Sequence, residues 1–340
     1  MDDFKPLTFG NRESKTRKEK TDEIPSLSFG DDKPSSDTIF TPLSDINVVR
    51  TSRSKDDSGL DNFVPEMSSS KKKEEVKNQD SHFVFFFGTA ESGKSVILST
   101  MLYALCTKFG ALRPKLGTRN TKEAMVLLSD FFENIRKGIL PGRTTRDQVT
   151  RMDLVFEPNN KSKRVFPINL TFLETSGENH NEIKRGGEFH SSIDQYLRAN
   201  IPLTFILVTS YTAAHQEDAI LREFLYRLEE RSKNLKQANV VLVISKWDKS
   251  GSMEPSKDEL DFFIRERLPM TSSLLDTYGL SKTYYTVGEL EKVDGEERIV
   301  RLSLNTAEIL SKWLYRSIAG IPVDYKGTFW ENIRWSLFGK

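Results

Sequence analysis

The sequence has 340 residues, and its 50 Lys and Arg nearly balance its 49 Asp and Glu, for a net charge of +1. This balance gives no global electrostatic case for binding nucleic acid or a membrane surface. The single cysteine, Cys106, excludes an internal disulfide; together with the lack of a signal-peptide pattern and of any apolar run near ~18 residues, it favours a cytoplasmic protein.

The first segment, residues 1–80, is predicted to be a disordered N-terminal region. It is rich in Ser, Asp, Lys, Glu and Pro, and such a segment buries too little apolar surface to offset its conformational entropy. A Leu-x-Phe-Gly motif occurs twice in it, within residues 6–11 and 26–31. Two interpretations stay open: a docking motif that orders on a partner, or chance recurrence in a low-complexity segment.

Beyond residue 80, apolar runs that predict strands alternate with patterns that predict helices. Strands are predicted at 82–87, 152–156, 165–173, 203–208, 240–244 and 284–287, and a hairpin at 290–302 that turns at Asp294 and Gly295. Helices are predicted after residue 95 and at 122–137, 216–234, 258–268 and 306–318. This order predicts an α/β fold with a doubly wound, mostly parallel sheet, which binds ligands at the carboxyl ends of its strands.

A glycine-rich loop follows the first predicted strand. Residues 88–95, GTAESGKS, match the phosphate-loop pattern G-x-x-x-x-G-K-[ST] in full, with a strand before and a helix after them. Such a loop turns backbone N–H groups and the positive end of a helix toward phosphate. Lys94 is predicted to reach the β- and γ-phosphates and to act in catalysis, and Ser95 to ligate Mg²⁺. The predicted nucleotide-binding residues of this loop are Gly88, Thr89, Ala90, Glu91, Ser92, Gly93, Lys94 and Ser95.

A second motif follows the strand predicted at 240–244. Residues 245–248, SKWD, resemble the [NT]-K-x-D element of GTPases, with serine in place of Asn or Thr. A carboxylate at Asp248 can accept hydrogen bonds from guanine N1–H and its 2-amino group, which adenine lacks, and the stem of Lys246 can lie against the base. The motif therefore predicts a preference for guanine.

The segment ETSGE at 174–178 follows another predicted strand and is similar to the D-x-x-G element of GTPases. The resemblance implies that Glu174 binds Mg²⁺ and that the backbone of Gly177 contacts the γ-phosphate. Glu178 stands where many GTPases have Gln. Its carboxylate can orient or deprotonate water, although a negative charge beside the γ-phosphate is electrostatically unfavourable.

The loop LPGRTT at 140–145 lies where GTPases carry a threonine that ligates Mg²⁺, so the resemblance implies this role for Thr144 or Thr145. Arg143 is either an arginine finger acting within the same chain or a solvated loop residue. Val287 follows the last predicted strand, where a backbone N–H can meet the guanine O6.

From Phe83 to about Ile318 the chain resembles translation-factor-related, Ras-like P-loop GTPases. The phosphate loop is also similar to that of heterotrimeric G-protein alpha subunits, while LPGRTT, LETSGE, SKWD and a late Lys-Trp-Leu helix look more like bacterial double-GTPase-type proteins. The resemblance implies a GTPase-like G domain at 81–320, followed by an aromatic C-terminal tail at 321–340.

The sequence thus predicts a Mg²⁺-dependent molecular switch that binds GTP and GDP and hydrolyses GTP slowly. One alternative is a GTP-binding interaction or sensor module that does not hydrolyse, and another is a P-loop ATPase. A protein effector is expected at the switch loops, the N-terminal segment or the C-terminal tail; a membrane or nucleic-acid partner is not expected.

Overall fold

The computed structural model describes residues 80–142, 149–175, 177, 183, 189, 191–199, 201–231, 235–236 and 238–327. The predicted N-terminal disorder, its repeated motif and the tail beyond residue 327 lie outside these residues. In chain order the elements are β1 (His82–Phe87), α1 (Lys94–Ala104), η1 (Leu105–Phe109), β2 (Gly110–Pro114), α2 (Thr121–Arg136), β3 (Val149–Pro158), β4 (Ile168–Thr175), α4 (Ser191–Arg198), β5 (Leu203–Ser210), α5 (Ala214–Glu230), β6 (Asn239–Ser245), η3 (Trp247–Ser250), α6 (Lys257–Arg267), α7 (Pro269–Tyr278), β7 (Ser281–Tyr284), β8 (Gly288–Val293), β9 (Glu296–Leu302) and α8 (Asn305–Ala319).

A seven-stranded sheet in the order β2-β3-β4-β1-β5-β6-β7 forms the centre of the fold. The five strands β4, β1, β5, β6 and β7 run parallel to one another, and β3 pairs antiparallel with both β2 and β4. The α/β fold class predicted from the sequence is confirmed. Because β4, β1, β5, β6 and β7 are parallel, their carboxyl ends meet along one edge of the sheet.

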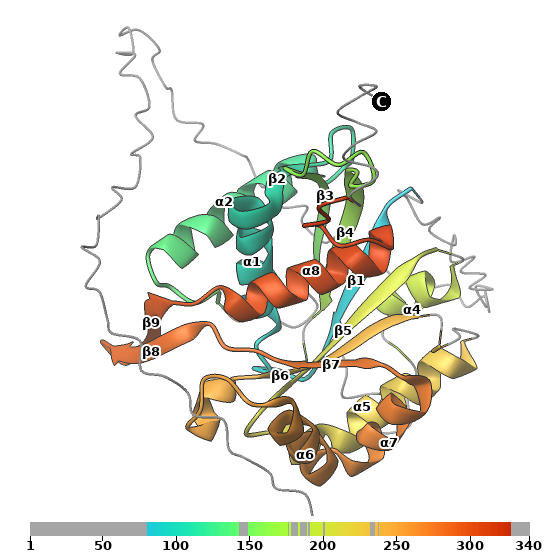
Figure 1. Cartoon of the computed structure of the whole chain (residues 1–340), viewed down its shortest axis with the longest axis vertical. Coiled ribbons are helices and arrows are strands. Elements are labelled where there is room, and N and C mark those ends of the chain that lie inside the picture. The colour runs from blue at the N-terminus through green and yellow to red at the C-terminus, as the bar shows by residue number, and fades with distance from the viewer. Residues whose placement is uncertain are drawn as a thin grey trace, which may run out of the picture. The chain divides into compact units, whose positions relative to one another are not determined.

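The central strand β1 is buried on both faces, and its side chains alternate between two cores. Phe83, Phe85 and Phe87 pack into the core covered by α4, α5, α6 and α7. Val84 and Phe86 pack into the opposite core, with α1, α2 and α8. Figure 1 shows these two groups of helices on opposite sides of the strands. A continuous apolar run is what a strand between two helix layers requires.

Local signals place most helix ends near the predicted positions. Ser256 accepts a hydrogen bond from the backbone N–H of Glu259, and the Glu259 carboxylate accepts one from the backbone N–H of Ser256, so a capping box starts α6. The predicted hairpin is present as β8 and β9. Its turn residues Asp294 and Gly295 both have positive φ, 54° and 86°, as a tight two-residue turn demands.

One predicted strand was misplaced, and β2, α4 and α7 were not predicted. The strand predicted at 284–287 lies earlier, at β7 (Ser281–Tyr284), because residues 281–284 are the ones that pair with β6. The prediction missed β2, whose Gly110 and Pro114 suggest a loop but whose backbone pairs along β3. It also missed α7, which starts with Pro269 in its first turn, a position where proline's missing N–H costs nothing.

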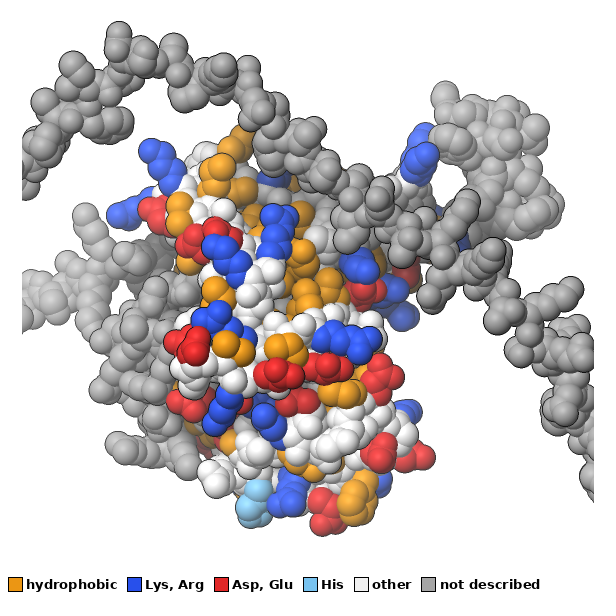
Figure 2. All heavy atoms as spheres, turned by 90° about the vertical axis from the view of Figure 1, so that its left-hand side faces the viewer, with side chains coloured by type: hydrophobic (Ala, Val, Ile, Leu, Met, Phe, Trp, Pro, Cys, Tyr) orange, Lys and Arg blue, Asp and Glu red, His pale blue; other side chains and the backbone are white. Residues whose placement is uncertain are grey.

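The face of the molecule shown in Figure 2 matches the balanced composition. The face turned to the viewer in Figure 2 carries basic and acidic side chains mixed together, with hydrophobic side chains between them. Among the helices of the described residues, none combines the length and the apolarity needed to cross a bilayer.

Candidate functional site

The glycine-rich loop between β1 and α1 is curled by left-handed backbone angles, with φ of 63° at Glu91 and 92° at Gly93. The following residue, Lys94, is the first of α1, so the positive end of that helix faces the inside of the loop. Gly88 cannot carry a side chain, because a Cβ there would lie 2.2 Å from the carbonyl oxygen of Val208. The strand, loop and helix predicted around residues 88–95 are therefore all present.

Lys94 lies inside this loop with only 6% of its surface exposed. Its Nζ donates hydrogen bonds to the carbonyl oxygens of Gly88, at 3.0 Å, and Thr89, at 2.8 Å. Burial lowers the pKa of Lys94 to about 8, although the negative charges of Glu174 and Glu217 act in the opposite direction. The lysine is thus held at the centre of the loop by groups that a phosphate oxygen can replace.

The predicted Mg²⁺ ligands Ser95 and Glu174 are neighbours. The Ser95 hydroxyl donates to Glu174 Oε1 at 2.5 Å, and Glu174 is 2% exposed at the end of β4. A hydroxyl beside a buried carboxylate is a donor set that suits Mg²⁺, which usually takes one or two protein oxygens and completes its shell with phosphates and water. The described residues contain no group of three or more His, Cys, Asp or Glu that could hold a metal alone.

Sequence reasoning missed Glu217, on the first turn of α5. Its carboxylate is 7% exposed and accepts hydrogen bonds from the hydroxyls of Thr89, in the phosphate loop, and Thr209, at the end of β5. Thr89 and Glu217 are 128 residues apart, and no local pattern marks the pair. Glu217 therefore braces the phosphate loop from the β5 side.

Gly177 lies directly against the phosphate loop. A Cβ at this position would come within 2.0 Å of the backbone nitrogen of Ala90 and 2.1 Å of the carbonyl carbon of Thr89. Only glycine permits this approach, and whether Gly177 contacts a phosphate stays a prediction. Glu178, Arg143, Thr144 and Thr145 lie outside the described residues, so their predicted roles stay predictions.

The SKWD turn is tied to the phosphate loop by Ser245. Its hydroxyl lies 2.5 Å from the carbonyl oxygen of Ser92, to which it donates. Lys246 then adopts a left-handed backbone, with φ of 53°. Trp247 packs inward as a buried side chain, so Lys246 and Asp248 on either side of it line a neighbouring cavity.

Two adjoining cavities result. One, of about 60 Å³, is lined by residues that include Lys246, Asp248 and Val287. The other, of about 230 Å³, is lined by Lys94, Ser95, Glu174 and Gly177, among others. The two share five lining residues, namely Gly93, Val96, Leu140, Lys246 and Glu297. The predicted base-side and phosphate-side residues thus line two adjoining cavities, and Lys246 lines both.

The hairpin β8–β9 forms a wall of this site that the sequence did not predict. Leu290 and Glu297 line the smaller cavity. The Ile299 N–H donates to the carbonyl of Gly138 at 2.8 Å, and Ile139 pairs with Arg298. The hairpin therefore holds the segment that runs into the loop at 140–145.

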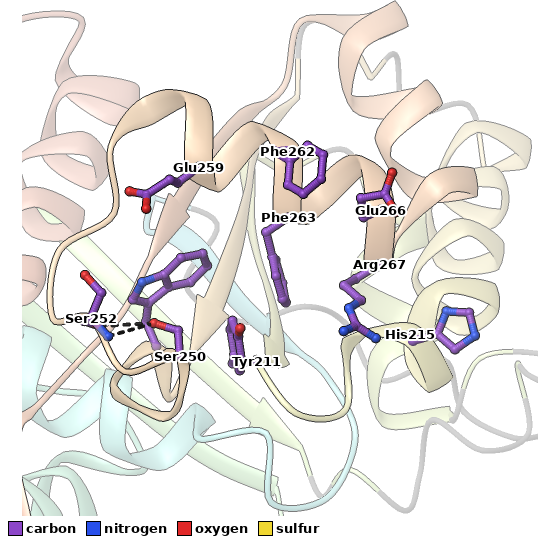
Figure 3. Close-up of a pocket in the computed structure, with 10 residues that line it drawn as sticks. Tyr211, His215, Ser250, Ser252, Glu259, Phe262, Phe263, Glu266 and Arg267 are labelled. Atoms are coloured by element: carbon purple, nitrogen blue, oxygen red, sulfur yellow. Dashed lines mark hydrogen bonds between the residues drawn. The ribbon is translucent and has the colours of Figure 1, made fainter.

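A larger cavity, of about 630 Å³, lies on the other side of the SKWD turn. Its centre is aromatic: Tyr211 stacks on Phe263 with ring centroids 4.6 Å apart, and Trp247 meets both rings edge-on. Figure 3 shows Glu259 toward one end of it and Arg267 and His215 toward the other. It shares no lining residue with the two cavities above, so it is separate from the candidate nucleotide site.

Comparisons with known proteins add little to this geometry. No family model matches the chain, and no curated protein matches it. Among solved structures, that of Methanosarcina barkeri Roco2 RocCORdC bound to GDP is similar, with a TM-score of 0.32 and 14% sequence identity over 76% of this chain. The match covers 55% of that structure's chain, so this chain spans about half its length.

Proposed function

We propose that the chain binds a guanine nucleotide with Mg²⁺ and hydrolyses GTP slowly, as a molecular switch. The observation that carries the proposal is the hydrogen bond from the Ser245 hydroxyl to the Ser92 carbonyl, at 2.5 Å. It fixes the base-selecting turn to the phosphate loop, and the two cavities beside it share five lining residues. A nucleoside polyphosphate requires a phosphate site and a base site at a fixed distance from each other.

Guanine selectivity rests on Asp248. Its side chain is 18% exposed and lies 3.8 Å from Lys249 Nζ, and its carboxylate oxygens can accept hydrogen bonds from the guanine N1–H and 2-amino groups. Adenine offers no donor at these positions and would leave the carboxylate unpaired, which is costly in a partly buried site.

Phosphate chemistry rests on the loop. Lys94 would exchange its two carbonyl partners for oxygens of the β- and γ-phosphates, and Ser95 and Glu174 would hold Mg²⁺. The metal supplies positive charge that stabilises the leaving diphosphate. Catalysis would then be mainly positional, with Gly177 touching the γ-phosphate, Glu178 orienting the water, a Thr144 or Thr145 hydroxyl on the metal, and Arg143 near the transferring phosphate.

One observation favours the non-hydrolysing alternative. Gly177 packs so closely on Ala90 that a γ-phosphate between them requires this contact to open. A site that opens to admit GTP but does not position it for attack by water would make the chain a GTP-binding sensor that does not hydrolyse, read by an effector through the change at Gly177.

Calorimetric titration with GDP, GTP, ADP and ATP in Mg²⁺, together with a phosphate-release assay, tests the proposal. Guanine nucleotides should bind more tightly than adenine nucleotides. Asp248→Ala should weaken the binding of guanine nucleotides, whereas the control Asp258→Ala, at an exposed site on α6, should not. Lys94→Ala should abolish phosphate release. Preferential binding of ATP would refute the guanine assignment in favour of a P-loop ATPase, and GTP binding without release would favour the sensor.

A further inference from the structure

The five residues shared by the two cavities mark the middle of the candidate nucleotide site. In a nucleotide the ribose joins the base to the phosphates, so it would lie beside the residues common to both cavities: Gly93, Val96, Leu140, Lys246 and Glu297. Gly93 belongs to the phosphate loop and the stem of Lys246 is expected against the base, which leaves Glu297 as the shared polar side chain without a role at either end. Glu297 is the carboxylate among them, and it comes from the hairpin rather than from any motif of the sequence.

The backbone holds Glu297 at this position. Two residues further along β9, the Ile299 N–H donates a hydrogen bond to the Gly138 carbonyl at 2.8 Å. Gly138 has φ of 70°, and a Cβ at this position would lie only 2.4 Å from the Ile299 carbonyl oxygen, so the contact requires glycine. Successive side chains on a strand point to opposite faces, so Glu297 faces the cavities while Glu296 points away and is 76% exposed.

The charge around Glu297 suits a neutral hydroxyl ligand. Its Oε1 lies 3.6 Å from Lys249 Nζ, and the same ammonium group lies 3.8 Å from Asp248 Oδ2. The positive charge of Lys249 therefore lies between the two carboxylates and offsets part of their repulsion of the phosphates. An ionised carboxylate only accepts hydrogen bonds, and the two neighbouring hydroxyls of a ribose are donors in the correct arrangement for one carboxylate.

We propose that Glu297 binds the ribose hydroxyls of the nucleotide and makes the site select ribonucleotides over deoxyribonucleotides. The inference rests on the proposed guanine-nucleotide site and adds a specificity residue to it. The Glu297 side chain is 43% exposed, so the contribution is that of a partly solvated hydrogen bond: a loss of about ten-fold in affinity on removing the hydroxyl that it binds.

The test compares dissociation constants of GDP, 2′-deoxy-GDP and 3′-deoxy-GDP, in Mg²⁺, for the wild type, Glu297→Ala, Glu297→Gln and the control Glu296→Gln. The wild type and the control should bind GDP about ten-fold more tightly than at least one deoxy form. Glu297→Ala should lower the affinity for GDP to that of this deoxy form, and should leave the affinity for the deoxy form itself nearly unchanged. Glu297→Gln, which keeps one acceptor oxygen, should lie in between.

Two results would overturn the inference alone: equal wild-type affinity for all three nucleotides, or a Glu297→Ala variant that weakens all three by the same factor. The second would indicate a general electrostatic or structural role. If the wild type binds none of the three, the proposed guanine-nucleotide site itself is wrong, and the ribose contact falls with it. Thermal unfolding of each variant shows whether the hairpin still folds.

Discussion

The burial of Lys94 should make nucleotide binding depend on pH above neutrality. In the free protein desolvation lowers the pKa of this lysine to about 8, whereas a bound phosphate would stabilise its charged form and raise the pKa again. Nucleotide binding therefore takes up a proton wherever the free lysine is neutral. At pH 8, with a pKa of about 8, the uptake should be about half a proton per nucleotide.

The size of the effect follows from the titration curve. With a pKa of about 8, the protonated fraction of Lys94 falls from about 90% at pH 7 to about 10% at pH 9, which predicts a ten-fold loss of affinity over two pH units. Isothermal titration calorimetry with GDP at several pH values, in buffers of different ionisation enthalpy, measures both affinity and proton uptake. Ionisation of guanine N1 also weakens binding near pH 9, so the Lys94 titration is read from the points between pH 7 and 8.5.

Folding stability should change in the opposite direction. The unfolded lysine has its ordinary pKa of 10.5, so between pH 8 and 10.5 the unfolded state binds more protons, and nucleotide-free protein gains stability as pH rises. The full difference corresponds to about 3 kcal/mol. The free energy of unfolding is measured in denaturant at each pH for the wild type and for Lys94→Met. The difference between the two gives the contribution of Lys94 ionisation to stability. Flat GDP affinity from pH 7 to 9 without proton uptake would refute the reasoning.

Three substitutions test other contacts of the site. Gly177→Ala places a methyl group 2.0 Å from the Ala90 nitrogen, so GTP turnover should fall about ten-fold or more, and unchanged phosphate release would contradict the close packing. Ser245→Ala removes the hydrogen bond to Ser92 and should weaken GDP binding by about 1 kcal/mol in calorimetry, whereas an equal affinity would show that the bond does not hold the two halves in register. Glu217→Ala should lower the free energy of unfolding by about 1–3 kcal/mol and Glu217→Gln by much less, since glutamine can keep both threonine partners; equal losses would mean that the charge matters and the hydrogen bonds do not.

The glycine-rich loop at 88–95 was predictable because its geometry needs only short-range features. A curled backbone requires glycine at fixed spacing, and Lys94 and Ser95 must follow at the start of a helix. All of these residues therefore lie within the eight consecutive positions 88–95. The α/β fold was predictable for a similar reason, because a strand such as β1 between two helix layers must be apolar throughout.

The remaining parts of the site depend on contacts that leave no local pattern. Glu217 looks like an ordinary charged residue of an amphipathic helix, and its burial follows only from the position of α5 beside the phosphate loop. The hairpin was predicted as an element, but nothing in its sequence indicates that Glu297 lines the site or that Ile299 pairs with Gly138. Strand β2 was missed because its pairing with β3 overrides a poor local propensity.

The pairing of β9 with Gly138 has a consequence for how the site opens. A two-stranded ribbon is only marginally stable by itself, and here it supplies one wall of the pocket while it restrains the chain that enters the 140–145 loop. The smaller of the two sheets in the described part of the chain thus borders both cavities of the candidate site, through Glu297. Fraying of that ribbon would loosen the lining of both cavities together, so a bound molecule would be released as a whole rather than one end at a time.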